Sequence, residues 1–506
     1  MKKKSICIFI FTVILIFCLI ISGTAQTKKE LKIGFGQNVA SLDPHYNTSI
    51  QDILASTLIY ESLATYDRDR NIVPVLATSW KQIDDLTWEI KLREGVTFHS
   101  GNPFNAEAVK FSIERCSKTG PGGGYVGMVE HVEIVDDYTV NLYLKYEFGP
   151  IISHLSSGVV GILDPAFVKE KGEDIGQYAS GTGAYQLKEY VPGSKVVYVK
   201  NDNYWGEPAK IETVEYVIIP EASTRVMALK TGEIDLVENP PPHELPSIEK
   251  DENLYVYISP KSRTLFMGFN MNDPNVGGKE NQPLREAINY AIDRDAIADY
   301  VLEGLGSAAH EGIMPTAVTG GLNDPTLVRK HDLEKAKQIL KDAGVPPGKT
   351  IEFLVTRSRY LLDTEIGEVI QGQISKLGIN VDLRPMEYAS LAAILKEDKH
   401  QMYQVAWGCM TGEPTAPYFQ LMSSTSMSNF SNWGDEETDK ILDKALATVD
   451  WKERMIIYEQ LYKKIFEDVA MIPIVLYQNI YAANKQLKNL YASPEELLDV
   501  KNFYFE

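Results

Sequence analysis

The sequence predicts an α/β protein with two lobes and a smaller β-rich subdomain. Strand-like and helix-like segments alternate along most of the chain, and its 506 residues suffice for two to four domains. Hydrophobic residues make up 44% and charged residues 24%, which is typical of a globular chain and excludes general disorder.

Two segments predict βαβ units, in which a crossover helix joins parallel strands. Each has an extended run, a helix ended by a glycine and a second extended run; the three parts are 351–355, 363–377 and 379–383 in one unit, and 214–218, 223–231 and 234–236 in the other. Residues 283–292 and 333–343 have the apolar spacing of helices that cover a sheet.

The β-rich subdomain is predicted from residues 72–100, where polar and apolar side chains alternate. A helix capped by Asn105 should run to about Cys116, and we expect the glycine-rich residues 119–124 to break it. The strand-like residues 472–481 should rejoin the first lobe, so that the chain crosses between the lobes twice.

The N-terminus is typical of a secretory signal peptide. Lys2, Lys3 and Lys4 precede an apolar run at 6–21, which is short for a membrane span, and we expect cleavage after Ala25. An uncleaved membrane anchor is the alternative. Beyond this leader only Cys116 and Cys409 remain, and we interpret them as two free, buried thiols.

The charge and the motifs limit the possible functions. A formal net charge of −19 argues against nucleic-acid partners, which need basic faces. No two of the eight histidines lie within five residues, and G-x-S-x-G, Walker A and C-x-x-C are absent, so we predict no metal and no cofactor. Gly122, Gly124 and Gly127 match G-x-G-x-x-G, yet a predicted helix precedes them instead of a strand. A secreted hydrolase with a carboxylate pair built by the fold stays open as an alternative.

Several sequence blocks together carry a resemblance to a known family. The longest is Arg93-Glu94-Gly95-Val96-Thr97-Phe98-His99-Ser100-Gly101-Asn102-Pro103-Phe104-Asn105-Ala106-Glu107-Ala108-Val109; the others are Ser41-Leu42-Asp43-Pro44, Tyr60-Glu61-Ser62-Leu63, Gly181-Thr182-Gly183-Ala184-Tyr185, Asn203-Tyr204-Trp205, Gly232-Glu233-Ile234-Asp235, Phe269-Asn270 and Pro283-Leu284-Arg285-Glu286-Ala287-Ile288. In this order they resemble the family 5 extracellular solute-binding proteins of ABC importers, which include oligopeptide, dipeptide, glutathione and nickel binders.

The resemblance implies a two-lobed periplasmic-binding-protein-like α/β fold with mixed sheets and a hinge. Such a protein closes over its ligand and delivers it to membrane permease subunits; it is not an enzyme, and we expect a monomer. By family analogy, lobe I comprises residues 26–72, 181–270 and 475–506, its small subdomain 73–180, and lobe II 271–474.

The resemblance also implies where a ligand binds. Peptide binders of the family hold the peptide amine with an Asp three residues after a Trp; here Trp407 is followed by Met410 at that position, then by Thr411 and Glu413. A thioether pairs poorly with an ammonium group, so Glu413 would have to replace the missing acid. Arg357 aligns with the arginine that binds the peptide carboxylate in dipeptide binders.

Nickel binding is a partial mismatch, because the region that should hold a ligating histidine, residues 414–433, contains none. Four aromatic side chains could form a floor for a peptide, a metal chelate or an oligosaccharide: Trp407, Tyr360, Tyr185 and Tyr418. We therefore predict a peptide or a similar small polar ligand, with a chelate or a sugar as the alternative.

Overall fold

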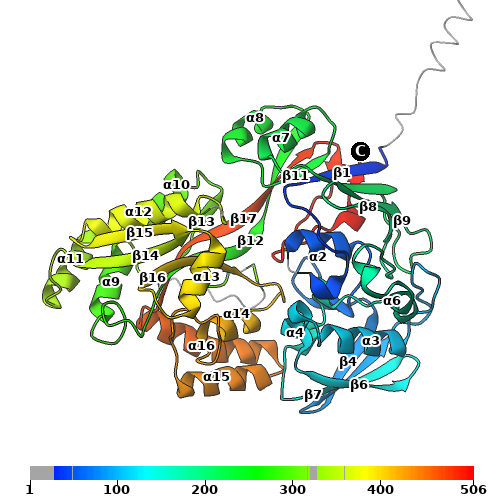
Figure 1. Cartoon of the computed structure of the whole chain (residues 1–506), viewed down its shortest axis with the longest axis horizontal. Helices are drawn as coiled ribbons and strands as arrows, with labels where there is room; N and C mark the ends of the chain where they lie inside the picture. Colours follow the sequence, from blue (N-terminus) through cyan, green and yellow to red (C-terminus); the bar gives the residue numbers. More distant parts are fainter. Residues whose placement is uncertain (1–27, 48, 311, 316, 319–327, 358) are drawn as a thin grey trace, which may run out of the picture.

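The computed structural model describes residues 28–47, 49–310, 312–315, 317–318, 328–357 and 359–506. Its elements lie on either side of two long strands, β12 (Leu254–Phe269) and β17 (Met471–Asn484), as Figure 1 shows. We call the right-hand group in that view, with the C-terminal segment, lobe I, and the left-hand group lobe II.

Lobe I contains the N-terminal strand and most of the residues on both sides of the small subdomain. Its elements are β1 (Glu30–Phe35), η1 (Pro44–Tyr46), α2 (Ile50–Thr57), β2 (Ala64–Tyr66), β3 (Ile72–Pro74), β8 (Tyr185–Val191), β9 (Lys195–Lys200), β10 (Thr213–Ile218), α7 (Ala222–Lys230), β11 (Leu236–Glu238), η4 (Pro242–Glu244), α8 (Leu245–Glu249), β18 (Leu487–Lys488), η5 (Val500–Asn502) and β19 (Tyr504–Phe505).

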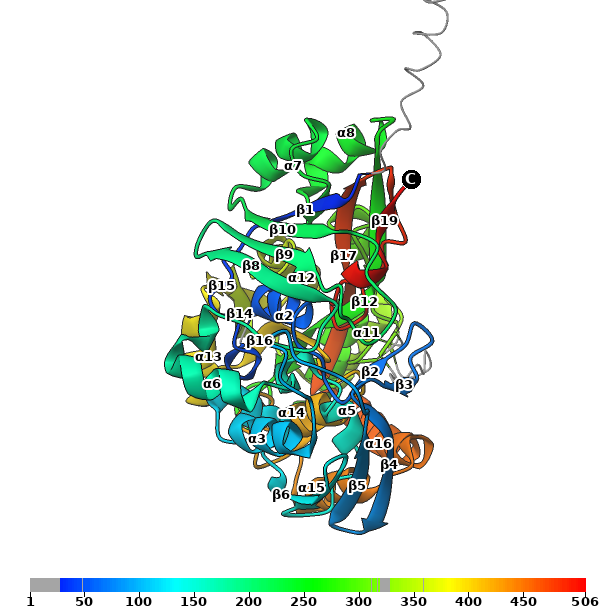
Figure 2. The ribbon, with the colours of Figure 1, turned by 90° about the vertical axis from the view of Figure 1, so that its right-hand side faces the viewer.

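The small subdomain has its own sheet and its own hydrophobic core. It lies at the opposite end of the molecule from α7 and α8, as Figure 2 shows. Its elements are β4 (Ala77–Asp84), β5 (Thr87–Leu92), α3 (Ala106–Cys116), α4 (Gly120–Val126), β6 (Val129–Asp136), β7 (Thr139–Leu144), α5 (Ile151–His154), η2 (Gly158–Val160), α6 (Pro165–Lys171) and η3 (Gly172–Gly176).

Lobe II combines a parallel sheet with helices that cover it. Its elements are α9 (Gln282–Ala291), α10 (Arg294–Tyr300), β13 (Gly306–Ala308), α11 (Leu333–Asp342), β14 (Thr350–Thr356), α12 (Asp363–Ser375), β15 (Asn380–Met386), α13 (Tyr388–Lys396), β16 (Met402–Gly408), α14 (Thr415–Met422), α15 (Glu436–Ala447) and α16 (Trp451–Glu467).

Strands β12 and β17 link the two lobes. They pair antiparallel along most of their length, from Leu254 opposite Asn484 to Gly268 opposite Met471. One strand path therefore runs through the molecule in the order β15-β14-β16-β12-β17-β11-β1-β10-β9-β8. Since both crossings belong to the same antiparallel pair, the strands that join the lobes also support each other.

The predicted βαβ units are confirmed. In lobe II, β14 and β15 pair in parallel around α12; in lobe I, β10 and β11 both pair in parallel with β1, which lies between them. Helix α3 begins after the cap Asn105 and ends at Cys116, as expected. β17 rejoins lobe I by pairing with β11.

The prediction for the glycine-rich segment was wrong in one respect. Helix α3 ends before it, but Gly120–Val126 forms the further helix α4. The side chain of Thr119 accepts a hydrogen bond from the backbone amide of Gly122, and Pro121 occupies a first-turn position that needs no amide hydrogen. A Cβ atom on Gly122 would lie 2.5 Å from the Cys116 sulfur, so glycine lets α4 pack closely against α3.

Cys116 and Cys409 are free and buried, as predicted. The predicted signal peptide and its cleavage site lie outside the described residues. Within the part of the chain that the structure describes, no helix is long and apolar enough to cross a membrane. The domain boundaries remain a prediction.

Candidate functional site

Three of the sequence blocks meet at one buried carboxylate, that of Glu61. It accepts hydrogen bonds from the hydroxyl of Thr182 at 2.8 Å, the hydroxyl of Tyr204 at 2.6 Å and the indole nitrogen of Trp205 at 2.8 Å. Burial raises the pKa of Glu61, and these donors oppose the shift. The three blocks therefore build one wall of lobe I around a common acceptor.

The longest block forms a turn that is tied to the rest of lobe I. Asp164 accepts hydrogen bonds from the Ser100 hydroxyl at 2.5 Å and from the Asn102 amide at 2.9 Å. The imidazole of His99 contacts the carbonyl oxygen of Gly183 at 2.9 Å, and burial lowers its pKa to about 4. These contacts hold the turn against the loop that carries Thr182.

A cavity of ≈ 580 Å³ lies beside the Glu61 wall and includes residues of both lobes. Lobe I contributes β2, the segment around Ser157, η5 and the C-terminal residues before it, whereas lobe II contributes Met410 and Thr411. Its aromatic lining consists of Tyr60, Tyr66, Tyr185, Tyr204, Trp205 and Tyr491. The volume and the aromatic lining suit a small ligand with polar groups.

The lobe II loop at the cavity is held by lobe I. The Tyr66 hydroxyl donates to the carbonyl oxygen of Thr411, and the Arg70 guanidinium donates to that of Gly412, both at 3.2 Å. Arg70 also lies over the Tyr66 ring, 4.4 Å from its centroid, and forms a short ion pair with Glu495. The cavity is thus closed on this side by a direct contact between the lobes.

Close packing at Gly412 explains why the loop fits there. Its φ of +75° is in the left-handed region, and a Cβ atom would lie 2.1 Å from a ring carbon of Tyr66. A second contact between the lobes joins the small subdomain to α15: the amide of Gly149 donates to the carbonyl oxygen of Leu446 at 2.6 Å.

Three of the predicted site residues line the cavity, namely Tyr185, Met410 and Thr411. Two more lie on lobe II near its strand ends. Tyr360 donates from its hydroxyl to the carbonyl oxygen of Ala406 at 3.1 Å, which ties the segment after β14 to β16, and Trp407 is partly buried against a lobe II core. Arg357 is exposed and donates to the carbonyl oxygen of Pro385 at 3.0 Å.

Glu413 and Tyr418 lie inside lobe II instead of lining the cavity. The Glu413 carboxylate accepts from the Thr415 hydroxyl at 2.6 Å and lies 3.4 Å from the Arg454 guanidinium. Burial raises the pKa of Glu413, and Arg454 opposes this shift. Tyr418 packs against the Tyr458 ring at 4.9 Å. A ligand contact by either residue stays a prediction, one that would need these partners to be displaced.

Sequence reasoning missed the lobe I residues that surround the cavity: Tyr66, Arg70, Glu495 and Lys501. Arg70 and Glu495 are 425 positions apart, and no pattern along the chain connects them. The block containing Tyr60 and Glu61 was the one available signal, because it directly precedes β2.

The structure also has a hollow of ≈ 460 Å³ on lobe II, with Asp273, Glu352, Asp382 and Asp398 in its lining. Among the described residues, however, no group of three or more His, Cys, Asp or Glu side chains is arranged to hold a metal ion.

Comparison with known proteins gives one family and several relatives. A family model described as bacterial extracellular solute-binding proteins, family 5, matches residues 71–429. The glutathione-binding protein GsiB of Pectobacterium atrosepticum is 27% identical over 500 residues, covering 95% of each chain.

Solved structures have the same architecture. HbpA2 from Haemophilus parasuis superposes with a TM-score of 0.85 at 26% identity, covering 94% of this chain and 100% of that one. The periplasmic binding protein DppA from Helicobacter pylori, in complex with the peptide STSA, has a TM-score of 0.76 at 26% identity, covering 95% and 98%.

Proposed function

The chain belongs to family 5 of the bacterial extracellular solute-binding proteins, and on that premise we propose that it captures a short peptide between its two lobes. The family consists of solute-binding components of transporters. We propose that this member, too, performs no catalysis, is exported after cleavage behind Ala25, works as a monomer and delivers its ligand to the permease subunits of an ABC importer.

The observation that carries this proposal is the cavity shared by the lobes. Met410 and Thr411 of lobe II line it together with Tyr66, Tyr204 and Trp205 of lobe I. A ligand in this cavity would touch both lobes and therefore stabilise the arrangement in which Tyr66 and Arg70 hold the 410–412 loop. A permease can read that arrangement through the surfaces of both lobes.

A peptide ligand is supported by the relatives and by the lining. Proteins of similar length and fold bind glutathione or the peptide STSA. The aromatic faces and backbone groups around the cavity can hold a peptide chain while leaving its side chains in water.

The test begins with mass spectrometry of whatever is released when the purified mature chain, residues 26–506, is denatured. Calorimetry then measures binding of glutathione and of the peptide STSA, with solution scattering to follow compaction. Recovered peptides, or micromolar or tighter peptide binding with a smaller radius of gyration, would support the proposal. A recovered sugar or metal chelate would replace the peptide with that ligand, and turnover without compaction would point to a secreted hydrolase.

A further inference from the structure

Lys501 is a positive charge at the cavity wall without an acidic partner. It lies in η5, lines the cavity, and its ammonium nitrogen is 5.5 Å from the centroid of the Tyr204 ring. No ion pair between Lys501 and any residue that the structure describes is formed within 4.0 Å. Its charge does act at a distance, since it lowers the pKa of Glu61.

Two of the acidic side chains around the cavity are already satisfied by lobe I. The Glu61 carboxylate has its three side-chain donors. Glu495 forms its ion pair with Arg70, whose guanidinium bonds to both carboxylate oxygens. Neither group therefore requires the Lys501 ammonium as a counterion.

The other two acids in the lining also have partners. Asp67 accepts from the backbone amide of Asn71 at 2.8 Å, which lowers its pKa. Asp499 accepts from the Arg68 guanidinium at 2.9 Å and from the side-chain amide of Asn502 at 2.8 Å. Arg68, the second cation in the lining, is thus occupied by Asp499.

Lys501 is consequently the one lining charge of the described cavity whose counterion the protein does not supply. An ammonium group offers three donors and binds carboxylate oxygens through charge-assisted hydrogen bonds. We infer, building on the proposed function, that Lys501 binds a carboxylate group of the peptide ligand. Four carboxylates nearby would repel a dianion such as phosphate, so a singly charged carboxylate fits this wall better.

This assignment differs from the one that the family resemblance implies. Arg357 was predicted to bind the ligand carboxylate, but it is exposed on lobe II and does not line the cavity. The two arginine and lysine positions can therefore be separated by mutation.

The experiment compares the peptide STSA with its C-terminal amide by calorimetry, using the full mature chain. The variants are Lys501→Met, Lys501→Arg and Arg357→Ala. Lys210→Met is the matched control, because Lys210 also lies over a tyrosine ring, that of Tyr504 at 4.8 Å, but does not line the cavity.

We expect the wild type and the control to bind the acid at least about tenfold more tightly than the amide. Lys501→Met should lose that preference while binding the amide as the wild type does, and Lys501→Arg should keep most of it. Equal binding of acid and amide by the wild type would overturn the inference without any variant, as would an unchanged preference in Lys501→Met or a preference lost only in Arg357→Ala.

Failure of the proposed function has a different signature. If the wild type bound neither form of the peptide, nor glutathione, the peptide proposal would fail and the carboxylate assignment with it. If it bound both forms equally, peptide binding would stand and only the role of Lys501 would fall.

Discussion

The hydroxyl of Tyr66 in lobe I donates a 3.2 Å hydrogen bond to the carbonyl oxygen of Thr411 in lobe II. Thr411 lines the cavity, and Tyr66 lines it from the other lobe. A single bond thus connects ligand lining to lobe closure. Arg70, held by Glu495 and lying over the Tyr66 ring, keeps the tyrosine in place.

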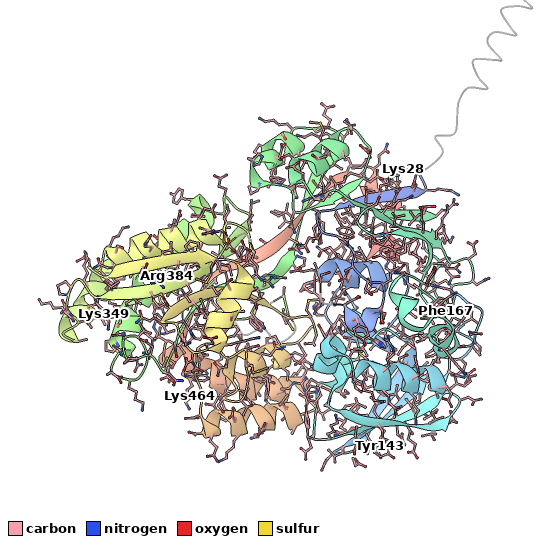
Figure 3. All side chains as sticks on the ribbon, viewed as in Figure 1. Lys28, Tyr143, Phe167, Lys349, Arg384 and Lys464 are labelled. Carbon is pink, nitrogen blue, oxygen red and sulfur yellow. The ribbon has the colours of Figure 1, made fainter. Side chains whose placement is uncertain are left out.

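Removing this hydroxyl should weaken ligand binding without unfolding the protein. We expect Tyr66→Phe to lose about 0.5–1.5 kcal/mol of binding free energy, or roughly a threefold to tenfold change in affinity for the bound peptide. The control is Tyr143→Phe, which loses a hydrogen bond to Glu133 on the outer face of the small subdomain (Figure 3). An equal effect of both variants in calorimetry would contradict the role of Tyr66.

Gly412→Ala should disturb the contact between the lobes more strongly. The variant adds a methyl group where a Cβ atom would meet the Tyr66 ring at 2.1 Å, in addition to the strain of a positive φ. Gly344→Ala is the control for strain alone, since its φ is +69° and no atom lies within 4 Å of the added Cβ.

Both glycine variants should lose about 1 kcal/mol of unfolding free energy from backbone strain. Only Gly412→Ala should also show a larger radius of gyration in solution scattering with saturating ligand. Scattering curves that coincide for the two variants would mean that the 410–412 loop does not hold the lobes together.

Glu61 should be a stability residue of lobe I. Glu61→Gln replaces a carboxylate that accepts three hydrogen bonds with an amide that has one acceptor oxygen, so at least one buried donor loses its partner. We expect a loss of about 1–3 kcal/mol of unfolding free energy in urea. The exposed Glu133→Gln, which accepts one tyrosine hydroxyl, should lose less than about 0.5 kcal/mol. Similar losses in both variants would refute this role.

Glu238 at the end of β11 should make stability depend on pH. Burial and the neighbouring Glu496 raise its pKa from 4.5 to about 7, against the opposing effects of Gln51, Arg225 and Arg263. The folded state therefore keeps the proton longer than the unfolded state does. The stability from this group is fully present below pH 4.5 and is lost as the pH rises through about 7.

Glu238→Gln lacks this titration. Its unfolding free energy minus that of the wild type should therefore grow between pH 5 and pH 8, by at most about 3 kcal/mol. The exposed Glu233→Gln should show no such growth in paired urea titrations. A pH-independent difference for Glu238→Gln would show that its proton is not retained on folding.

The sequence determined by itself the features that depend on neighbouring residues. The cap Asn105 and the apolar spacing behind it place α3, and the run from 350 to 386 places β14, α12 and β15, because hydrophobic periodicity and capping act within a few turns. Helix α4 escaped prediction because its glycines are tolerated only where they pack against Cys116.

The tertiary structure alone decided which side chains surround the ligand cavity. Met410 and Thr411 reach it, whereas Glu413, only three positions beyond Met410, turns into the core of lobe II toward Arg454. Arg70 and Glu495 meet across 425 positions, and Lys501 lies over a ring that belongs to Tyr204. Such contacts arise where the chain crosses twice between its lobes, and the local propensities that place helices and strands carry no information about which distant segments those crossings bring together.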